Sequence, residues 1–316
     1  MILLTGAFGF IGMHAARAFI DAGQEVILTR NRSYREPEFI KDDLGKRAVV
    51  EQVDITNAES LMDLGRRYKI DGICHLAGPG YSAPNAATDY RINVFGLLNI
   101  LEAARRWQVK RLALASSIAT YYYGGAGRGP FVETMPLRMT ATNPIETYKK
   151  VDELLGNHYA DRTGIDIAFL RIALIYGPLH SGGAANIAHW LTRAGVDGVQ
   201  PELPNPVFEE DTTDLCYVAD CARAIVLLQL ADKLNHRVYN LGDGKATSAK
   251  QVAAAVEKVV PGAKVAGALK PGRGPNYTVD RYMDLSRIKA DVGYEPQYTL
   301  ERGIAEYAAW FQDHEE

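Results

Sequence analysis

Short apolar runs alternate with longer segments of helical periodicity through the first half of the chain. The runs predicted as strands are Ile2–Thr5, Glu25–Thr29, Ala48–Gln52, Gly72–Leu76, Arg111–Ser116 and Ile167–Leu170. The segments predicted as helices are 10–22, 57–68, 89–107 and 145–163. A strand, a helix and a second strand in this order form a right-handed unit with parallel strands. The pattern therefore predicts an α/β fold built on a doubly wound parallel sheet.

After Pro178 the periodicity weakens, because glycines and prolines crowd the stretch up to residue 211, and we expect loops and short elements there. A strand and helix return over 212–230 and a strand over 238–242, and helices are expected at 248–259 and 298–312. We expect two units with a ligand cleft between them. The nucleotide-binding sheet would comprise residues 1–177 plus 212–245, and a smaller C-terminal substrate lobe would comprise residues 178–211 plus 246–316.

Composition and charge limit the classes of partner that the chain is expected to bind. The chain has 316 residues, of which 35 are basic and 38 acidic, for a net charge of −3. This charge gives no basic field for nucleic acid or for an acidic membrane. The first apolar run breaks into glycines too early for a leader or an anchor, and the three cysteines lack the CxxC spacing of metal and redox sites. We expect a cytoplasmic protein with buried, reduced thiols, no metal site and a small-molecule substrate.

The stretch TGAFGFIG, residues 5–12, follows the first predicted strand and opens the first predicted helix. Gly6 would permit the tight turn, Gly9 would let the backbone approach a pyrophosphate, and Gly12 would let the helix pack closely on the strand. The phosphates would lie on the amides at the start of the helix, among Phe8, Phe10 and Ile11. The spacing, GxxGxxG, is one residue longer than GxGxxG, but its strand–turn–helix setting favours a dinucleotide site.

The second strand ends in VILTRNRSYRE, where a site for NAD usually carries an acidic residue that holds the ribose hydroxyls. Arg30 stands in that place, and Asn31, Arg32 and Arg35 follow. Guanidinium groups bind phosphate in a bidentate fashion, so this loop favours the 2′-phosphate of NADP. The alternative is a solvated basic loop with NAD as the cofactor.

Several motifs along nearly the whole chain resemble those of extended short-chain dehydrogenases/reductases of the NAD-dependent epimerase/dehydratase family. Beside the glycine loop, they are VDIT (53–56), HLAG (75–78), INVFGLLNILEAA (92–104), LRIALIYGP (170–178), TDLCYVADCARA (213–224), YNLGDGKATSAKQVA (239–253) and SRIKADVGYEP (286–296). The resemblance implies a Rossmann-type fold with NAD or NADP as cofactor. By the same resemblance, the cofactor would also contact Asp54, Ile55, Leu76, Ala77, Gly78, Asn93, Ser116 and Ile172.

The resemblance further implies a catalytic Ser or Thr, a tyrosine, and a lysine four residues after that tyrosine. The lysine would hold the nicotinamide ribose, and the tyrosine would exchange a proton with the substrate hydroxyl while hydride moves. In NPIETYKKVDE, residues 143–153, Lys149 matches the lysine, but Ile145 occupies the tyrosine position. No tyrosine stands four residues before any lysine of the chain. In SSIATYYYG, residues 116–124, Ile118 falls on the serine position.

We therefore expect Lys149 to keep its role and the proton-transfer group to be lost or moved. The candidates for the moved group are Tyr148, Ser117, Thr120, the run Tyr121–Tyr123, and Lys149 itself. His180, His189 and Trp190 follow YGP, where the family builds its substrate pocket, and are candidates for substrate contact.

Three functions stay open at this point. The first is an NAD(P)-dependent oxidoreductase or epimerase/dehydratase acting on a hydroxyl or carbonyl of a sugar, a nucleotide sugar or another small polar molecule, with a non-standard acid/base. The second is a cofactor-binding sensor or partner subunit without turnover. The third is a lyase or isomerase that uses its cofactor only briefly or structurally. Relatives commonly dimerise through helices that correspond to 89–107 and 145–163, so a homodimer is also expected.

Overall fold

A computed structural model describes residues 1–31, 37–78, 85–122, 129–141, 143–181, 183, 186–275 and 281–314, without the side chain of Tyr122. Its main feature is a parallel sheet of seven strands in the order β3-β2-β1-β4-β5-β6-β9. Those strands are β1 (Ile2–Thr5), β2 (Val26–Arg30), β3 (Ala48–Gln52), β4 (Gly72–His75), β5 (Arg111–Ser117), β6 (Ile167–Ile172) and β9 (Val238–Leu241). The order reverses between β1 and β4, which is where ligands bind in a doubly wound sheet.

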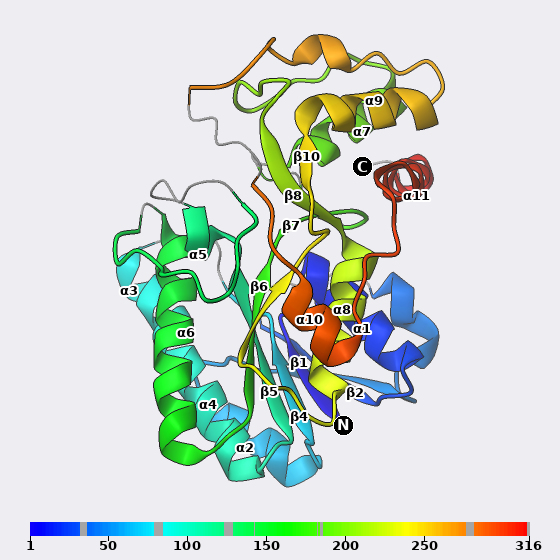
Figure 1. Ribbon diagram of the computed structural model, residues 1–316. Helices are drawn as coiled ribbons and strands as arrows, with labels where there is room; N and C mark the ends of the chain where they lie inside the picture. The colour runs from blue at the N-terminus through cyan, green and yellow to red at the C-terminus, as the bar shows by residue number, and fades with distance from the viewer. Residues whose placement is uncertain are drawn as a thin grey trace.

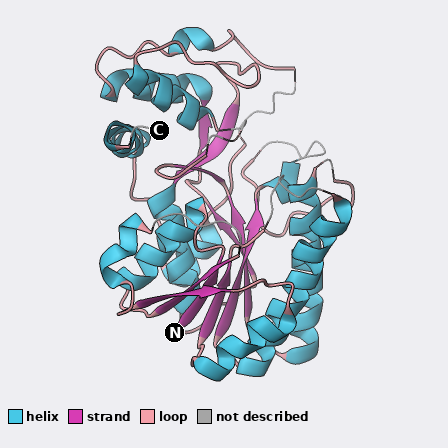
Figure 2. Cartoon of the chain, turned by 180° about the vertical axis from the view of Figure 1, so that it is seen from behind, coloured by secondary structure: helices cyan, strands magenta, loops and turns pink. Residues whose placement is uncertain are grey.

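Helices cover both faces of this sheet (Figures 1 and 2). On one face lie α2 (Ala58–Arg67), α4 (Gly96–Trp107) and α6 (Pro144–Thr163). Alternate strand residues such as Leu3 and Ile73 point toward them. On the other face α1 (Phe10–Asp21) and α8 (Val218–Leu230) bury the intervening residues, such as Leu4 and Cys74.

The predicted strands and most predicted helices are confirmed to within one or two residues, but segment 89–107 is not one regular helix. It consists of α3 (Ala86–Tyr90), a π-helical turn η2 (Arg91–Phe95) and α4. The side-chain amide of Asn93 donates to the backbone oxygen of Asp89 and to its Oδ1, both at 3.0 Å. A π turn is a frequent mark of a functional site, and apolar periodicity alone could not predict it.

The upper part of the molecule in Figure 1 is formed by a second sheet and by helices from the C-terminal half of the chain. A second sheet has the order β10-β8-β7 and contains β7 (Leu174–Tyr176), β8 (Thr212–Tyr217) and β10 (Ala246–Ser248). The helices not yet named are η1 (Glu38–Asp43), α5 (Ala119–Tyr122), α7 (Ile187–Asp197), α9 (Ala249–Val259), η3 (Ala266–Ala268), α10 (Ser286–Val292) and α11 (Leu300–Asp313). Helix α7 packs against α9 and α11.

Two details differ from the sequence-based expectation. Helix α7 lies in the stretch expected to hold only loops and short elements; Asn186 caps it by accepting the backbone N–H of His189. Segment 212–230, expected to stay with the large sheet, is shared: β8 joins the small sheet while α8 packs on the large one. The division of the chain into two domains remains a prediction.

The three cysteines are buried free thiols, as expected. Among the residues that the structure describes, no helix meets the length and apolarity that crossing a bilayer requires.

Candidate functional site

The turn between β1 and α1 has the geometry of a dinucleotide cradle. Gly6 has a φ of +71°, and a Cβ on it would lie 2.7 Å from the backbone nitrogen of Ala77. A Cβ on Gly12 would lie 2.1 Å from the Gly6 carbonyl oxygen. Among the described atoms, only the Gly6 oxygen, at 3.2 Å, would meet a Cβ on Gly9, so the backbone there stays open to a close ligand. The loop thus fits the pyrophosphate of a dinucleotide at the amide-rich start of α1.

The expected adenosine contacts lie at the ends of two paired strands. Arg30 ends β2, and its carbonyl accepts the N–H of Val53 at 2.9 Å. Asp54 is half-buried, and its Oδ1 accepts the backbone N–H of Thr56 at 2.9 Å and its hydroxyl at 2.8 Å. Ile55 is buried, whereas Asn31 is exposed beyond the strand. Arg32 and Arg35 lie outside the described residues.

The HLAG segment ends β4 beside the glycine loop. His75 Nδ1 lies 2.6 Å from Thr5 Oγ1 on β1, and the N–H of Ala77 donates to the same Oγ1 at 3.4 Å. Burial, and secondly the charge of Lys149, lowers the pKa of His75 to about 3, so this imidazole is neutral. Asn93 Oδ1 would lie 3.8 Å from a Cβ on Gly78, which places the π turn beside this segment.

Helix α6 carries the lysine. Asn143 caps the helix by accepting the N–H of Glu146 at 2.9 Å. Ile145 and Lys149, four residues apart, share a helix face, and Lys149 Nζ donates to Asp152 Oδ2 at 3.3 Å. The next residue, Lys150, points elsewhere and donates to Glu146 Oε1 at 2.6 Å.

Hydroxyl groups of the serine segment are engaged within the protein. Ser116 Oγ donates to Glu153 Oε1 at 2.5 Å. Thr120 is 1% exposed, and its hydroxyl donates to the Ser117 carbonyl at 2.9 Å. Ser117 is half-buried and accepts the backbone N–H of Ala119. Ile118 is buried after β5, and its N–H donates to the Ile172 carbonyl at 2.8 Å, which ties the serine segment to β6.

Neither described tyrosine candidate has the lowered pKa of a tyrosinate base. Tyr121 hydrogen-bonds Asn240 Oδ1 at 2.8 Å and Arg171 at 2.7 Å, and burial raises its pKa to about 12. The ring of Tyr148 packs edge-on against Tyr90 at 5.8 Å. Burial, then the charge of Asp89, raises the pKa of Tyr148. Tyr123 and the side chain of Tyr122 lie outside the described residues.

The histidines after YGP belong to an aromatic cluster that joins α1 to the upper helices. The His180 ring lies 4.9 Å from that of Phe10 and 5.5 Å from that of His189. His189 Nδ1 lies 2.6 Å from the Tyr307 hydroxyl of α11. Burial, and then the nearby His189, lowers the pKa of His180 to about 4. These rings connect the glycine-loop helix to the upper helices.

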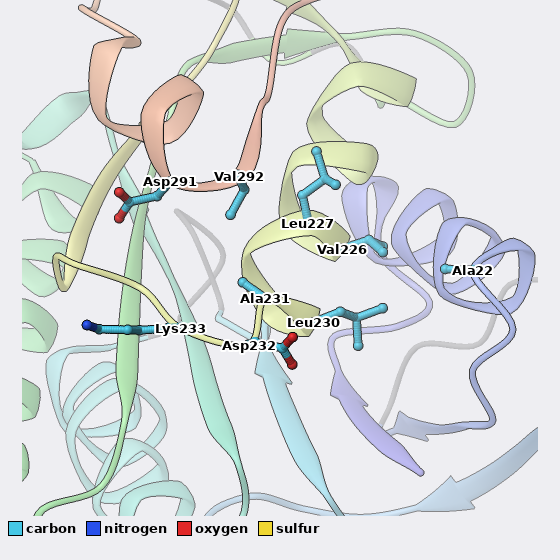
Figure 3. A pocket seen from close by; sticks show the side chains of 9 residues that line it. All are labelled: Ala22, Val226, Leu227, Leu230, Ala231, Asp232, Lys233, Asp291 and Val292. Carbon is cyan, nitrogen blue, oxygen red and sulfur yellow. The ribbon is translucent and has the colours of Figure 1, made fainter.

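A separate pocket of about 500 Å³ lies at the other end of the large sheet (Figure 3). It is lined by Ala22, Leu227, Leu230, Lys233 and Asp291, from the C-terminal ends of α1, α8 and α10. Ligands of doubly wound sheets bind at the carboxyl ends of the strands, where helices such as α1 begin. This pocket, at the opposite ends of the same helices, is therefore not the cofactor site. No group of three metal-ligating side chains occurs among the described residues.

The model of the NAD dependent epimerase/dehydratase family matches residues 2–242. The chain belongs to this family. The family comprises NAD-dependent epimerases and dehydratases, and several relatives are named as UDP-sugar epimerases, which assigns the chain to this class of enzyme.

Named relatives of the family cover almost the whole chain. The UDP-glucuronate 4-epimerase of Thermodesulfobacterium geofontis is 28% identical, and the alignment covers 98% of this chain and 96% of that protein. The crystal structure of UDP-glucose 4-epimerase from Thermotoga maritima with UDP-glucose is 26% identical, has a TM-score of 0.83, and covers 99% and 98% of the two chains. The UDP-glucose 4-epimerase of Thermus thermophilus in complex with NAD has a TM-score of 0.78 and 23% identity over 98% of each chain, which supports the fold.

Of the residues predicted for the site, the structure brings together the glycine loop, the HLAG segment and Asn93. The charge of Lys149 lowers the pKa of His75, which belongs to the HLAG segment. Ser116, Thr120 and Tyr121 instead make internal bonds. Sequence reasoning missed Asp152 as the partner of Lys149. The spacing of three residues on one helix would have been the signal for it.

Proposed function

We propose that this chain is an NAD-dependent epimerase- or dehydratase-type enzyme that acts on a nucleotide sugar. The observation that carries the proposal is the close contact at Gly12, where a Cβ would lie 2.1 Å from the Gly6 oxygen. The helix start is thereby held against the turn, which leaves its amides facing a ligand. The names of the relatives, which are UDP-sugar epimerases, support a UDP-sugar as substrate.

We propose NAD as the resident cofactor, with its pyrophosphate at the amides of α1 and its adenosine over the end of β2. The expectation of NADP came from three arginines, of which only Arg30 lies in the described part of the chain. The test of the cofactor choice is to compare the affinities for NAD and NADP in the wild type and in Arg30→Ala. Equal affinities for the two cofactors in the wild type would remove the argument that Arg30 favours NADP.

The bound cofactor would accept hydride from the substrate and return it. Lys149 would hold the nicotinamide end of the cofactor, because it matches the lysine of the family motif and its charge lowers the pKa of His75 at the end of β4. Ile145 and Ile118 cannot exchange a proton, so we propose a non-standard acid/base. Ser117 is the candidate that the described geometry favours among the hydroxyls, because it is half-buried whereas Thr120 is almost fully enclosed.

The experiment is to titrate the purified protein with NAD and then to add UDP-glucose or UDP-glucuronate. Formation of the epimer, detected by chromatography, or a change in the absorbance of reduced nicotinamide is the expected result. The variant Ile145→Tyr tests the acid/base. If the missing tyrosine limits the reaction, activity should rise by about 10²–10⁴. A fall instead would mean that the isoleucine belongs to a rebuilt site.

A second candidate function is a cofactor-binding sensor or partner subunit without turnover. The two isoleucines at the positions of the family's proton-transfer residues favour it. Tight binding of NAD with neither spectral change nor product for any UDP-sugar, in the wild type or in Ile145→Tyr, would select this function.

We also propose that the chain forms a homodimer through α4 and α6. Large apolar side chains are exposed on this side: Phe95 is 60% exposed, Leu98 40% and Leu154 66%. Such a patch is unusual on a monomer. Light scattering after gel filtration should give twice the mass of the chain, and Leu154→Glu should give a monomer. A wild-type monomer at micromolar concentration would remove this proposal.

A further inference from the structure

Helix α6 carries two neighbouring buried carboxylates with different partners. Glu153 joins the helix to the sheet, because its oxygens accept from Arg171 on β6 and from Ser116 on β5. Asp152 joins nothing across the fold. Within the described part of the chain, its one side-chain hydrogen bond comes from Lys149 Nζ at 3.3 Å, on the same helix.

The position of Asp152 is costly for the fold. Its side chain is 12% exposed, and a carboxylate withdrawn from water needs good partners to offset the loss. Burial raises the pKa of Asp152, the charge of Lys149 lowers it, and that of Glu153 raises it. A single 3.3 Å bond offsets little of this cost, and no hydrogen bond or ion pair to another described element explains the carboxylate.

Lys149 lies between Asp152 and the start of the helix. Ile145 comes one turn before it on the same face, and Asp152 lies almost one turn after it. The start of α6 is the end nearest the carboxyl edge of the sheet, where the pKa of His75 responds to the lysine. A ligand at the carboxyl edge of the sheet would meet the ammonium of Lys149 first, and the carboxylate of Asp152 would hold that ammonium from the far side.

We propose that Asp152 is the positioning residue of Lys149: it holds the ammonium in place and aimed at the cofactor site. This inference rests on the proposed function, because it assumes that Lys149 contacts the bound dinucleotide. Without Asp152, the half-buried Lys149 loses the one ion pair that the structure describes for it, and its ammonium is no longer held in one position. An ammonium that is held out of position makes a weaker hydrogen bond to the ligand.

Other charged or titratable groups on α6 and on the elements packed against it could also affect the pair. They are His75 at the end of β4, Tyr121 on α5, Arg91 on η2, Glu102 on α4, Arg171 on β6, and Glu146, Lys150 and Glu153 on α6 itself. Two of these groups are linked to the pair: Lys149 lowers the pKa of His75, and Glu153 raises the pKa of Asp152.

The test measures the dissociation constant of NAD at neutral pH. The proteins are the wild type, Asp152→Asn, Asp152→Glu and, as a matched control on the same helix, Asp161→Asn. Asp161 is 65% exposed and pairs with Arg237. Melting temperatures confirm that each variant folds, and Asp152→Ser replaces Asp152→Asn if the latter does not.

The wild type, Asp152→Glu and Asp161→Asn should bind NAD with nearly equal affinity. Asp152→Asn should bind NAD about tenfold more weakly, because a hydrogen bond from the ammonium is weakened. In a Lys149→Met background, Asp152→Asn should have no further effect, which a merely structural role would not produce. An Asp152→Asn affinity equal to that of the wild type would overturn the inference. Failure of the wild type to bind NAD would instead overturn the proposed function.

Discussion

The variant Glu153→Gln should destabilise the fold strongly, because Glu153 and Arg171 form an ion pair inside it. Their side chains are 8% and 4% exposed. Arg171 Nε donates to Glu153 Oε1 at 2.8 Å, and its terminal nitrogen donates to Oε2 at 2.6 Å. Ser116 Oγ also donates to Oε1. Glutamine keeps one acceptor, but its amide nitrogen sets a donor against the guanidinium and leaves that charge uncompensated.

The expected size follows from this geometry. Removing one partner of a buried pair costs about 3–5 kcal/mol, since the remaining charge stays away from water. For a chain of this size, each kcal/mol lowers the melting temperature by roughly 2–4 °C, so a fall of roughly 6–20 °C is expected. A matched control is Asp197→Asn, which removes the pair with Arg193, whose side chains are 29% and 37% exposed. Such surface pairs contribute about 0–1 kcal/mol.

The assay is thermal unfolding followed by circular dichroism, with urea unfolding to measure the free energy. The double variant Glu153→Leu with Arg171→Met removes both charges and should be more stable than Glu153→Gln. A Glu153→Gln melting temperature no lower than that of Asp197→Asn would refute the reasoning, because the pair would then contribute no more than a surface pair.

Three further predictions concern the site and its supports. Gly12→Ala should weaken NAD binding at least about tenfold, because the added Cβ needs the space of the Gly6 oxygen. The control is Gly267→Ala, whose added Cβ meets no described atom within 4 Å. Equal NAD affinities of the two variants would contradict the proposed pyrophosphate cradle. Burial raises the pKa of Asp214 to about 7 from 3.8, so its protonated form stabilises the fold at low pH and this contribution is lost as the pH rises to 7. Urea unfolding should show that the free energy of unfolding of the wild type falls by up to about 1.4 kcal/mol per pH unit relative to Asp214→Asn over this window. Parallel plots of unfolding free energy against pH for the two proteins would exclude a raised pKa at Asp214. Tyr148→Phe should leave NAD affinity within about twofold, because phenylalanine keeps the ring contact with Tyr90. A tenfold loss in a titration would return Tyr148 to the list of site residues.

Local pattern was sufficient for the large sheet and for the cofactor loop. Strand β1 was predicted to the residue and α6 to within one residue, because apolar runs and a capping Asn143 are local signals. The roles given to Gly6 and Gly12 follow from spacing alone, and the contacts of their missing Cβ atoms agree with a tight turn and close packing.

Long-range contacts account for what could not be predicted. The partner of the Tyr121 hydroxyl is Arg171, fifty residues away, so sequence alone could not separate this buried tyrosine from a catalytic one. Helix α7 was missed because the glycines and prolines around it dominate the composition. The burial of Asp152 depends on how α6 packs on the sheet, which its own segment does not reveal.

A crystal structure of the protein with saturating NAD tests the central claim most directly. The account predicts density for the pyrophosphate across the amides from Phe10 to Gly12 at the start of α1 and for the nicotinamide half within hydrogen-bond reach of Lys149 Nζ. An ordered glycine loop with no dinucleotide density along it would contradict the account.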